Sequence, residues 1–207
     1  MRLFVGVPLA DSVARELATV VARLRGGEGG GRIDGLRWSE PESWHVTLQF
    51  LGNATAEQLE CLKARLHEVR CAPVAVELGE LGSFERTGVL FVDVSVTPGL
   101  AALQQHVVTA TSECGFVAEA RPFHPHITLA RETGKKGSRE RGNKRAWEQG
   151  GEKARGQKNT LRELLAVAGK RRTLPRFTAR EFLLYESHLG AGGSKYEVRM
   201  RVALADE

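Results

Sequence analysis

Apolar and polar residues alternate along several short stretches of the chain, as they do in strands with one buried face. The clearest stretch is WHVTLQFL, residues 44–51. Its even positions, from Trp44 to Phe50, would face the core, and its odd positions, from His45 to Gln49, would face the other side. The same reasoning predicts further strands at residues 2–7, 74–78, 89–96, 126–131, 181–186 and 196–204, the last two joined by the turn LGAGG.

Other stretches repeat apolar residues every three to four positions, which is the pattern of helices with one buried face. Helices are predicted from about Asp11, from the capping box Thr55-x-x-Gln58, and over residues 100–114. A short fourth helix is predicted to follow Thr160. Strands and helices are therefore mixed, and the hairpin-like spacing of the strand pairs favours an α+β fold with antiparallel sheets.

One segment departs from this patterning. Residues 134–158 contain five Lys and four Arg against three Glu, so the segment carries a net charge of +6. The whole chain carries +5, so the rest of the chain carries about −1. The segment has six Gly and few apolar residues, so it cannot bury enough surface to offset the entropy of ordering. We expect a mobile basic insert that is either an arm attracting a polyanion or a solvated loop.

Three cysteines, Cys61, Cys71 and Cys114, show no CxxC spacing. An odd number without a motif suits buried thiols in a reducing compartment better than a disulfide framework or a zinc site. The short apolar run near the N-terminus lacks a small-residue cleavage site, and no 18 apolar residues run together. We therefore expect a cytoplasmic protein that is neither secreted nor attached to a membrane.

The kernel His-apolar-Thr-Leu occurs twice, in WHVTLQFLG from Trp44 and in PHITLARET from Pro125. Side chains at i and i+2 of a strand face the same way, so each copy would present an imidazole and a hydroxyl side by side. Such a set suits in-line displacement at a phosphodiester. One imidazole takes a proton from water while the other gives one to the leaving oxygen, and the hydroxyls donate to the phosphate oxygens.

Arg131 follows the second kernel and could add a charged planar fork for phosphate. Its strand parity is opposite to that of Thr128, so it would reach the same face only if the strand ends or bulges.

These motifs, with the opening RLFVGVPL, the segment FERTGVLFVDV and the closing LLYESHLGAGGSKYEV, resemble the 2H phosphoesterases, and among them the bacterial and archaeal RNA 2',3'-cyclic phosphodiesterases, or 2'-5' RNA ligases. The resemblance covers nearly the whole chain except the basic insert at about 134–158, which is longer and more basic than the family pattern. It implies one domain, 1–207, made of two similar α+β lobes related by a pseudo-twofold axis, with the two H-x-T strands lining a central cleft.

The resemblance also implies the roles of single residues. His45 would be the proton donor and His126 the proton acceptor, while Thr47, Thr128 and Arg131 would bind the phosphate. The expected reaction is hydrolysis of RNA 2',3'-cyclic phosphate ends to 2'-phosphates without metal or cofactor, and an additional, reversible 2'-5' RNA ligation is left open. The expected protein is a monomer, and its expected partner is RNA, such as tRNA fragments, or a small cyclic nucleotide.

Three alternatives stay open. His124-x-His126 could be half of a metal site, although Thr128 stands where a third ligand would and no carboxylate precedes Glu132. The substrate could instead be a small cyclic phosphate made from ADP-ribose, or the chain could bind RNA without catalysis. Rings at Phe84, Phe123 and Tyr185 could stack on a base, but core packing suits them better.

Overall fold

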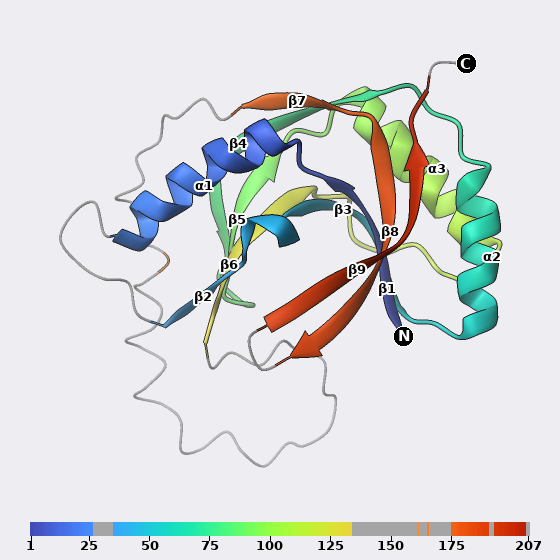
Figure 1. The fold of residues 1–207 in the computed structure, drawn as a ribbon, viewed down its shortest axis with the longest axis horizontal. Coiled ribbons are helices and arrows are strands. Elements are labelled where there is room, and N and C mark those ends of the chain that lie inside the picture. Colours follow the sequence, from blue (N-terminus) through green and yellow to red (C-terminus); the bar gives the residue numbers. More distant parts are fainter. Residues whose placement is uncertain (27–34, 134–160, 162–164, 166–174, 191–192, 206–207) are drawn as a thin grey trace, which may run out of the picture.

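The computed structural model describes residues 1–26, 35–133, 161, 165, 175–190 and 193–205, and its strands form two antiparallel sheets (Figure 1). The four strands of sheet A lie in the order β3-β1-β8-β9, and the five strands of sheet B in the order β2-β6-β5-β4-β7. The prediction of an α+β fold with antiparallel sheets is confirmed. The strands are β1 Arg2–Pro8, β2 Leu36–Trp38, β3 His45–Asn53, β4 Val74–Phe84, β5 Val89–Val94, β6 His126–Glu132, β7 Arg176–Ala179, β8 Glu181–Gly190 and β9 Gly193–Ala203.

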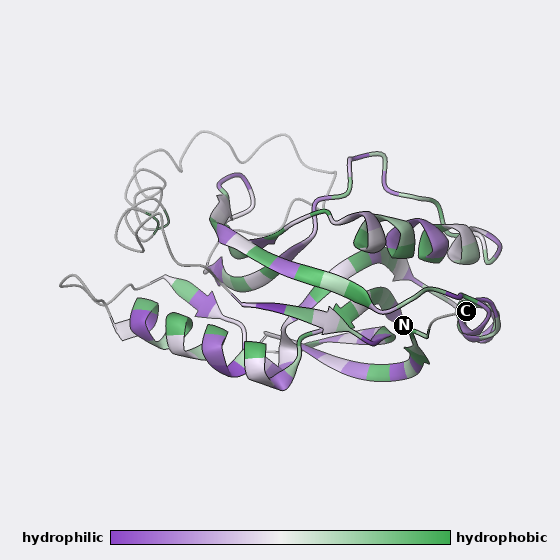
Figure 2. Cartoon of the chain, turned by 90° about the horizontal axis from the view of Figure 1, so that it is seen from above, coloured by the Kyte–Doolittle hydropathy of each residue, from purple (hydrophilic) through white to green (hydrophobic). Residues whose placement is uncertain are grey.

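In the described part of the chain, the sheets are accompanied by the helices α1 Asp11–Gly26, α2 Ala56–His67 and α3 Pro98–Ser112. The capping box before α2 forms as predicted, because the Thr55 hydroxyl accepts from the Gln58 backbone N–H and the Gln58 side chain accepts from the Thr55 N–H. Figure 2 shows both polar and apolar residues along α1. Its buried residues recur every three to four positions, at Val13, Leu17, Val21 and Leu24, as in a helix with one buried face. Helices α2 and α3 lie side by side (Figure 1).

Each H-x-T strand belongs to a different sheet, and β3 contacts β6 where the sheets meet. Both strands bulge at the same place in the repeat. Val5 pairs with Gln49 and Gly6 with Thr47, so Leu48 is skipped. In β6, the partners of Leu90 and Phe91 are Ala130 and Thr128, so Leu129 is skipped. The leucine of each kernel is therefore the extra residue of a β-bulge.

The bulge in β3 makes one sequence-based expectation wrong. Simple alternation put Gln49 beside His45 and Phe50 in the core. After the extra residue the faces exchange, so Gln49 is buried, where the Thr111 hydroxyl donates to its Oε1 at 2.7 Å. Phe50 is 46% exposed and pairs with Phe4, on the face of His45.

The expectation of free thiols is wrong for two of the three cysteines. Cys61 on α2 and Cys114, just after α3, form a disulfide with Cα atoms 5.8 Å apart, while Cys71 is free. The two cysteines lie 53 residues apart in sequence, and only the packing of α2 against α3 brings them together. The cysteine count therefore no longer supports a reducing compartment.

Several other expectations meet the limits of the described residues. The basic insert, most of the helix predicted after Thr160 and the middle of the LGAGG turn lie outside them. Strands β2 and β7 were not predicted, because three and four residues are too few to show alternation. No helix in the described ranges is both long enough and apolar enough to span a bilayer.

Candidate functional site

His45 and His126, each the first residue of its strand, are held in the same way. The Nδ1 atom of His45 lies 2.7 Å from the carbonyl oxygen of Ser43, and the Nδ1 atom of His126 lies 2.8 Å from that of His124. A carbonyl oxygen only accepts hydrogen bonds, so Nδ1 carries the proton in both rings. The Nε2 atom of each ring therefore remains for proton transfer. In a neutral imidazole Nε2 accepts a proton as a base, and in an imidazolium it donates one as an acid.

His45 is half-buried against aromatic rings. The ring of Phe4 lies 4.6 Å from the imidazole between centroids, that of Tyr196 5.1 Å and that of Tyr185 5.6 Å. The pKa of His45 is lowered to about 4, mainly by burial and also by the positive charges of His126 and Arg131, while the hydrogen bond to the Ser43 carbonyl opposes the shift. His45 is therefore neutral at pH 7 when the site is empty.

His126 has a comparable aromatic setting in sheet B. Phe84 lies 5.0 Å and Phe91 5.3 Å from its ring, centroid to centroid. Burial lowers the pKa of His126 as well, although the carbonyl of His124 partly opposes this. The side chain of His124 itself is half-exposed, and its Nε2 atom lies 2.9 Å from Oδ1 of Asp93. His124 is therefore more exposed than His126.

Two glycines make room for these rings. A Cβ at Gly6 would lie 2.9 Å from the Val46 carbonyl oxygen and 3.3 Å from Cδ2 of His45. A Cβ at Gly82 would lie 2.6 Å from the Phe91 ring that borders His126. Any other residue at either place would displace a strand or a ring of the site.

Thr47 and Thr128 follow their histidines at i+2 and are both half-buried. Neither hydroxyl has a hydrogen-bond partner in the described part of the chain. Because of the bulge at Leu129, Arg131 lies on the same face of β6 as His126 and Thr128. The sequence predicted that Arg131 would reach this face only if the strand ended or bulged. Arg131 also influences the pKa of both histidines, so the described chain brings His45, His126 and Arg131 into one electrostatic environment.

The sequence did not reveal Phe4, Gly6 or Tyr196 as neighbours of His45. Tyr196 lies on β9, the far edge of sheet A, yet it contacts the rings of both Phe4 and His45. Alternation placed it on one face of a strand, but only the pairing of the β8–β9 hairpin with β1 in sheet A brings it to the histidine. The rings of Phe84 and Tyr185, which the sequence suggested as core residues, border the two histidines as well.

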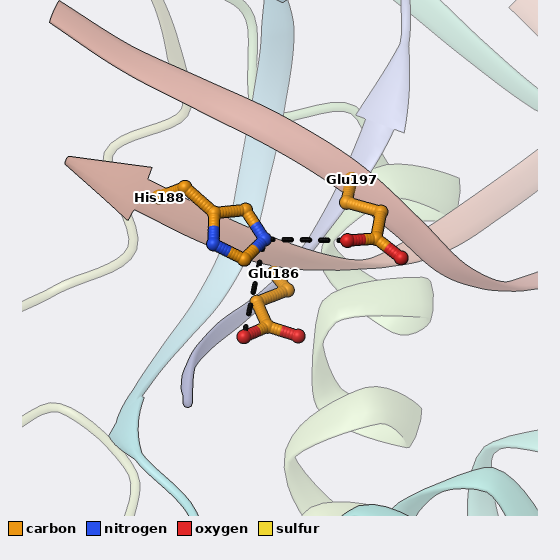
Figure 3. A group of neighbouring side chains, drawn as sticks. All are labelled: Glu186, His188 and Glu197. Atoms are coloured by element: carbon orange, nitrogen blue, oxygen red, sulfur yellow. Dashed lines mark hydrogen bonds and ion pairs between the residues drawn. The ribbon is translucent and has the colours of Figure 1, made fainter. Parts of the chain in front are cut away.

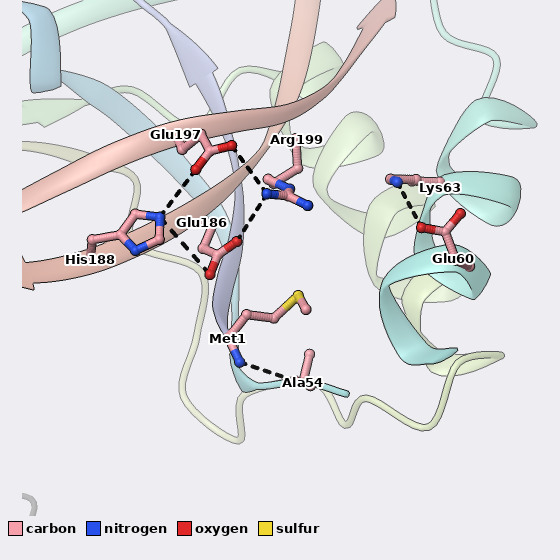
Figure 4. Close-up of polar contacts among 8 residues, drawn as sticks. All are labelled: Met1, Ala54, Glu60, Lys63, Glu186, His188, Glu197 and Arg199. Atoms are coloured by element: carbon pink, nitrogen blue, oxygen red, sulfur yellow. Dashed lines mark hydrogen bonds and ion pairs between the residues drawn. The ribbon is translucent and has the colours of Figure 1, made fainter. Parts of the chain in front are cut away.

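A separate charged cluster lies on the other face of the β8–β9 hairpin. Figure 3 shows the Nε2 atom of His188 between Glu186 and Glu197, at 3.9 and 3.3 Å from their oxygens. Arg199 contacts the remaining oxygens of both carboxylates at 3.4 and 3.1 Å (Figure 4). The side chains of Glu186, His188 and Glu197 lie close enough together to bind one cation. Arg199, however, already supplies a positive charge to both carboxylates. Alternation along the two strands also points this cluster away from the tyrosine rings beside His45.

Several known proteins are similar to this chain in sequence. A family model described as the 2'-5' RNA ligase superfamily matches residues 10–149. The RNA 2',3'-cyclic phosphodiesterase of Bacillus subtilis is 30% identical over 140 residues, which are 65% of this chain and 73% of that protein. That of Archaeoglobus fulgidus is 31% identical over 134 residues, which are 63% of this chain and 72% of that protein.

Solved structures share the whole fold. The apo structure of E. coli LigT has a TM-score of 0.67 and 22% identity, and the alignment covers 99% of this chain and 98% of that one. TT0787 of Thermus thermophilus has the same TM-score at 23% identity, with both chains fully covered. The fold is that of the LigT-like 2H phosphoesterases. The chain belongs to the 2'-5' RNA ligase superfamily.

Proposed function

We propose that this chain is an RNA 2',3'-cyclic phosphodiesterase that opens the terminal ring with two histidines as general acid and general base. The names of its relatives in Bacillus subtilis and Archaeoglobus fulgidus support the reaction. The observation that carries the mechanism is the matched pair of Nδ1–H bonds to backbone carbonyls, at 2.7 Å for His45 and 2.8 Å for His126. They fix both tautomers so that each Nε2 can exchange one proton.

In the proposed reaction, Nε2 of His126 takes a proton from a water molecule as the water oxygen attacks phosphorus. The bond from phosphorus to the 3'-oxygen breaks, and this oxygen receives a proton from Nε2 of His45. The product carries a 2'-phosphate and a 3'-hydroxyl, and water is consumed. The same steps in the same direction, with the 5'-hydroxyl of another RNA end in place of water, would form a 2'-5' phosphodiester and leave a 3'-hydroxyl, which is 2'-5' ligation.

The other polar groups would hold the phosphate. The hydroxyls of Thr47 and Thr128 can donate to its non-bridging oxygens, and the guanidinium of Arg131 can pair with its negative charge. We expect Thr47→Ala and Thr128→Ala to lower turnover about 10- to 100-fold each, which is less than loss of a histidine, because each removes one donor among several.

The pKa of His45, about 4 in the free protein, bears on its role as the acid. A group that must donate a proton at neutral pH needs a higher pKa than this. The negative charge of a bound cyclic phosphate favours the imidazolium form of His45 and raises its pKa. We therefore infer that His45 takes up a proton when the substrate binds. Binding of an unreactive phosphate analogue should then take up a proton, which calorimetry in buffers of different ionisation enthalpy measures.

The two sheets also support the inference that they are lobes related by a pseudo-twofold axis. Each H-x-T strand begins with a histidine bonded to the carbonyl two residues before it, and each bulges at the following leucine. Two copies of one device facing a common phosphate suit a reaction in which one proton is removed and another supplied.

A substrate with sulfur in place of the 3'-bridging oxygen tests the two roles. A thiolate leaves without help from an acid, because a thiol is far more acidic than an alcohol. We expect His45→Ala to lose about 100-fold or more on the oxygen substrate but less than about 10-fold on the sulfur substrate. His126→Ala should lose about 100-fold on both, and His106→Ala, an exposed histidine of α3, should match the wild type.

The opposite pattern, in which sulfur rescues His126→Ala but not His45→Ala, would exchange the two roles. Wild-type rates for both variants on both substrates would contradict the two-histidine mechanism.

A further inference from the structure

Two arginines face each other across the edge of sheet B. Arg37 on β2 is the direct partner of Arg131 on β6, and partners in an antiparallel pair present their side chains to the same face. Both residues expose part of their surface to solvent, while partial burial of the Arg131 guanidinium lowers its pKa and the positive charge of Arg37 adds to that shift. Like charges directly opposite in a sheet are destabilising, so the pair has a cost in the empty protein.

No acidic group offsets this charge within the described residues. Neither Arg37 nor Arg131 makes an ion pair there. Arg2, at the start of β1, adds a third positive charge that acts on Arg131. The site face is therefore basic on both sheets, and an anion bound between Arg37 and Arg131 would relieve their repulsion.

The place of Arg37 separates it from the histidines. Strand β2 is the outer neighbour of β6, so Arg37 lies one strand, about 4.8 Å, further from β5 than Arg131 does. The end of the β8–β9 hairpin lies beside it, since a Cβ at Gly193 would be 3.8 Å from Nε of Arg37. On the same hairpin, Tyr196 contacts the ring of His45. The hairpin therefore runs from the proposed catalytic centre to Arg37.

We propose that Arg37, on the strand next to the Arg131 that would hold the terminal phosphate, forms a second anion site that binds the phosphodiester on the 5' side of the terminal nucleotide. The inference rests on the proposed function, because it takes the terminal cyclic phosphate to lie at the two histidines. RNA continues from that nucleotide only through its 5'-phosphate, and a guanidinium pairs well with a phosphodiester. Arg37 would then distinguish an RNA end from a free cyclic nucleotide.

The test compares two substrates, a mononucleotide 2',3'-cyclic phosphate and a trinucleotide that ends in the same group. Arg37→Gln should lower kcat/KM for the trinucleotide about tenfold, the size of one lost hydrogen bond to a charged group, and leave the mononucleotide within about twofold. The plot of log kcat/KM against log salt for the trinucleotide should flatten by about 0.7. Arg37→Lys should keep that slope because it keeps the charge.

Arg180→Gln is the matched control. Arg180 is an exposed arginine at the start of β8, the end of that strand opposite the hairpin turn, and its substitution should change neither substrate. If Arg37→Gln slows both substrates equally, or neither, the second anion site is wrong.

Binding keeps this inference separate from the catalytic proposal. Fluorescence anisotropy with a trinucleotide that ends in a 2'-phosphate measures affinity without turnover. If the wild type hydrolyses neither cyclic substrate, the proposed function fails, but a weaker salt dependence of binding in Arg37→Gln would still support the anion site. An unchanged salt dependence would overturn it.

Discussion

At the scale of single residues, the burial of His45 has a consequence for stability. The pKa of His45 is about 4 in the folded protein against 6.5 for an ordinary histidine. Between these two pH values the unfolded chain therefore binds a proton at His45 that the folded chain does not bind. Stability is therefore full above pH 6.5 and is lost as the pH falls towards 4, by up to about 3 kcal/mol. Urea unfolding of wild type and His45→Gln between pH 4 and 7 measures this. The same pH dependence in both proteins would contradict the shift.

Gly6 gives a second prediction at this scale. In Gly6→Ala, the new methyl group would meet the Val46 carbonyl at 2.9 Å, and backbone cannot move aside as a side chain can. We expect a loss of about 1–3 kcal/mol in stability and a larger loss of turnover, because β3 carries His45. The control is Gly99→Ala, where a Cβ would make ordinary contacts of 3.6 Å with Val74. Unfolding and turnover of Gly6→Ala that match this control would show that β1 tolerates the methyl group.

At the scale of elements, the disulfide between α2 and the end of α3 predicts a stability effect without a catalytic one. It closes a loop of 53 residues, and the chain-entropy argument gives about 4 kcal/mol for such a loop. Cys61 lies in α2 and Cys114 just after α3, so neither belongs to a strand that carries a histidine.

Cys61→Ser with Cys114→Ser should lower the unfolding free energy by about 2–4 kcal/mol while turnover in buffer stays close to wild type. The free Cys71 supplies the control, and Cys71→Ser should leave stability nearly unchanged. Equal stability of the wild type with and without a reducing agent would mean that the bond does not form.

The bulges show what an element's sequence can and cannot predict. Alternation located β3 and β6 and placed His45 beside Thr47, because both precede the extra residue. It then put Gln49 and Phe50 on the wrong faces, because a bulge depends on the register with the neighbouring strand and leaves no mark in the strand's own pattern. The equivalent bulge at Leu129 places Arg131 on the same face of β6 as Thr128, whereas alternation alone would put it on the opposite face.

At the scale of the molecule, the order of strands and helices and the two H-x-T kernels were enough to predict an α+β fold. Contacts between distant parts of the chain were not predictable. Tyr196 reaches His45 only because the β8–β9 hairpin pairs with β1, and Cys61 meets Cys114 only because α2 packs on α3. Neither contact follows from local pattern, since each depends on how whole elements pack.

The proposed chemistry also predicts how the whole protein responds to chelators. No step needs a Lewis acid, because both proton transfers use imidazoles. Turnover should survive excess EDTA and gain nothing from added Mg²⁺ or Zn²⁺. Activity lost on chelation and restored by a metal ion would contradict this, and Glu186, His188 and Glu197 would then be the first residues to substitute.

The most direct test of the two-histidine mechanism is turnover of a short RNA that ends in a 2',3'-cyclic phosphate, with the position of the product phosphate determined by phosphorus NMR. The wild type should give a 2'-phosphate. His45→Ala and His126→Ala should each be slower by about 100-fold or more, and the double variant much less than multiplicatively slower, because the two side chains act as one unit. A folded variant at either position with near-wild-type turnover, or a 3'-phosphate product, would contradict the mechanism.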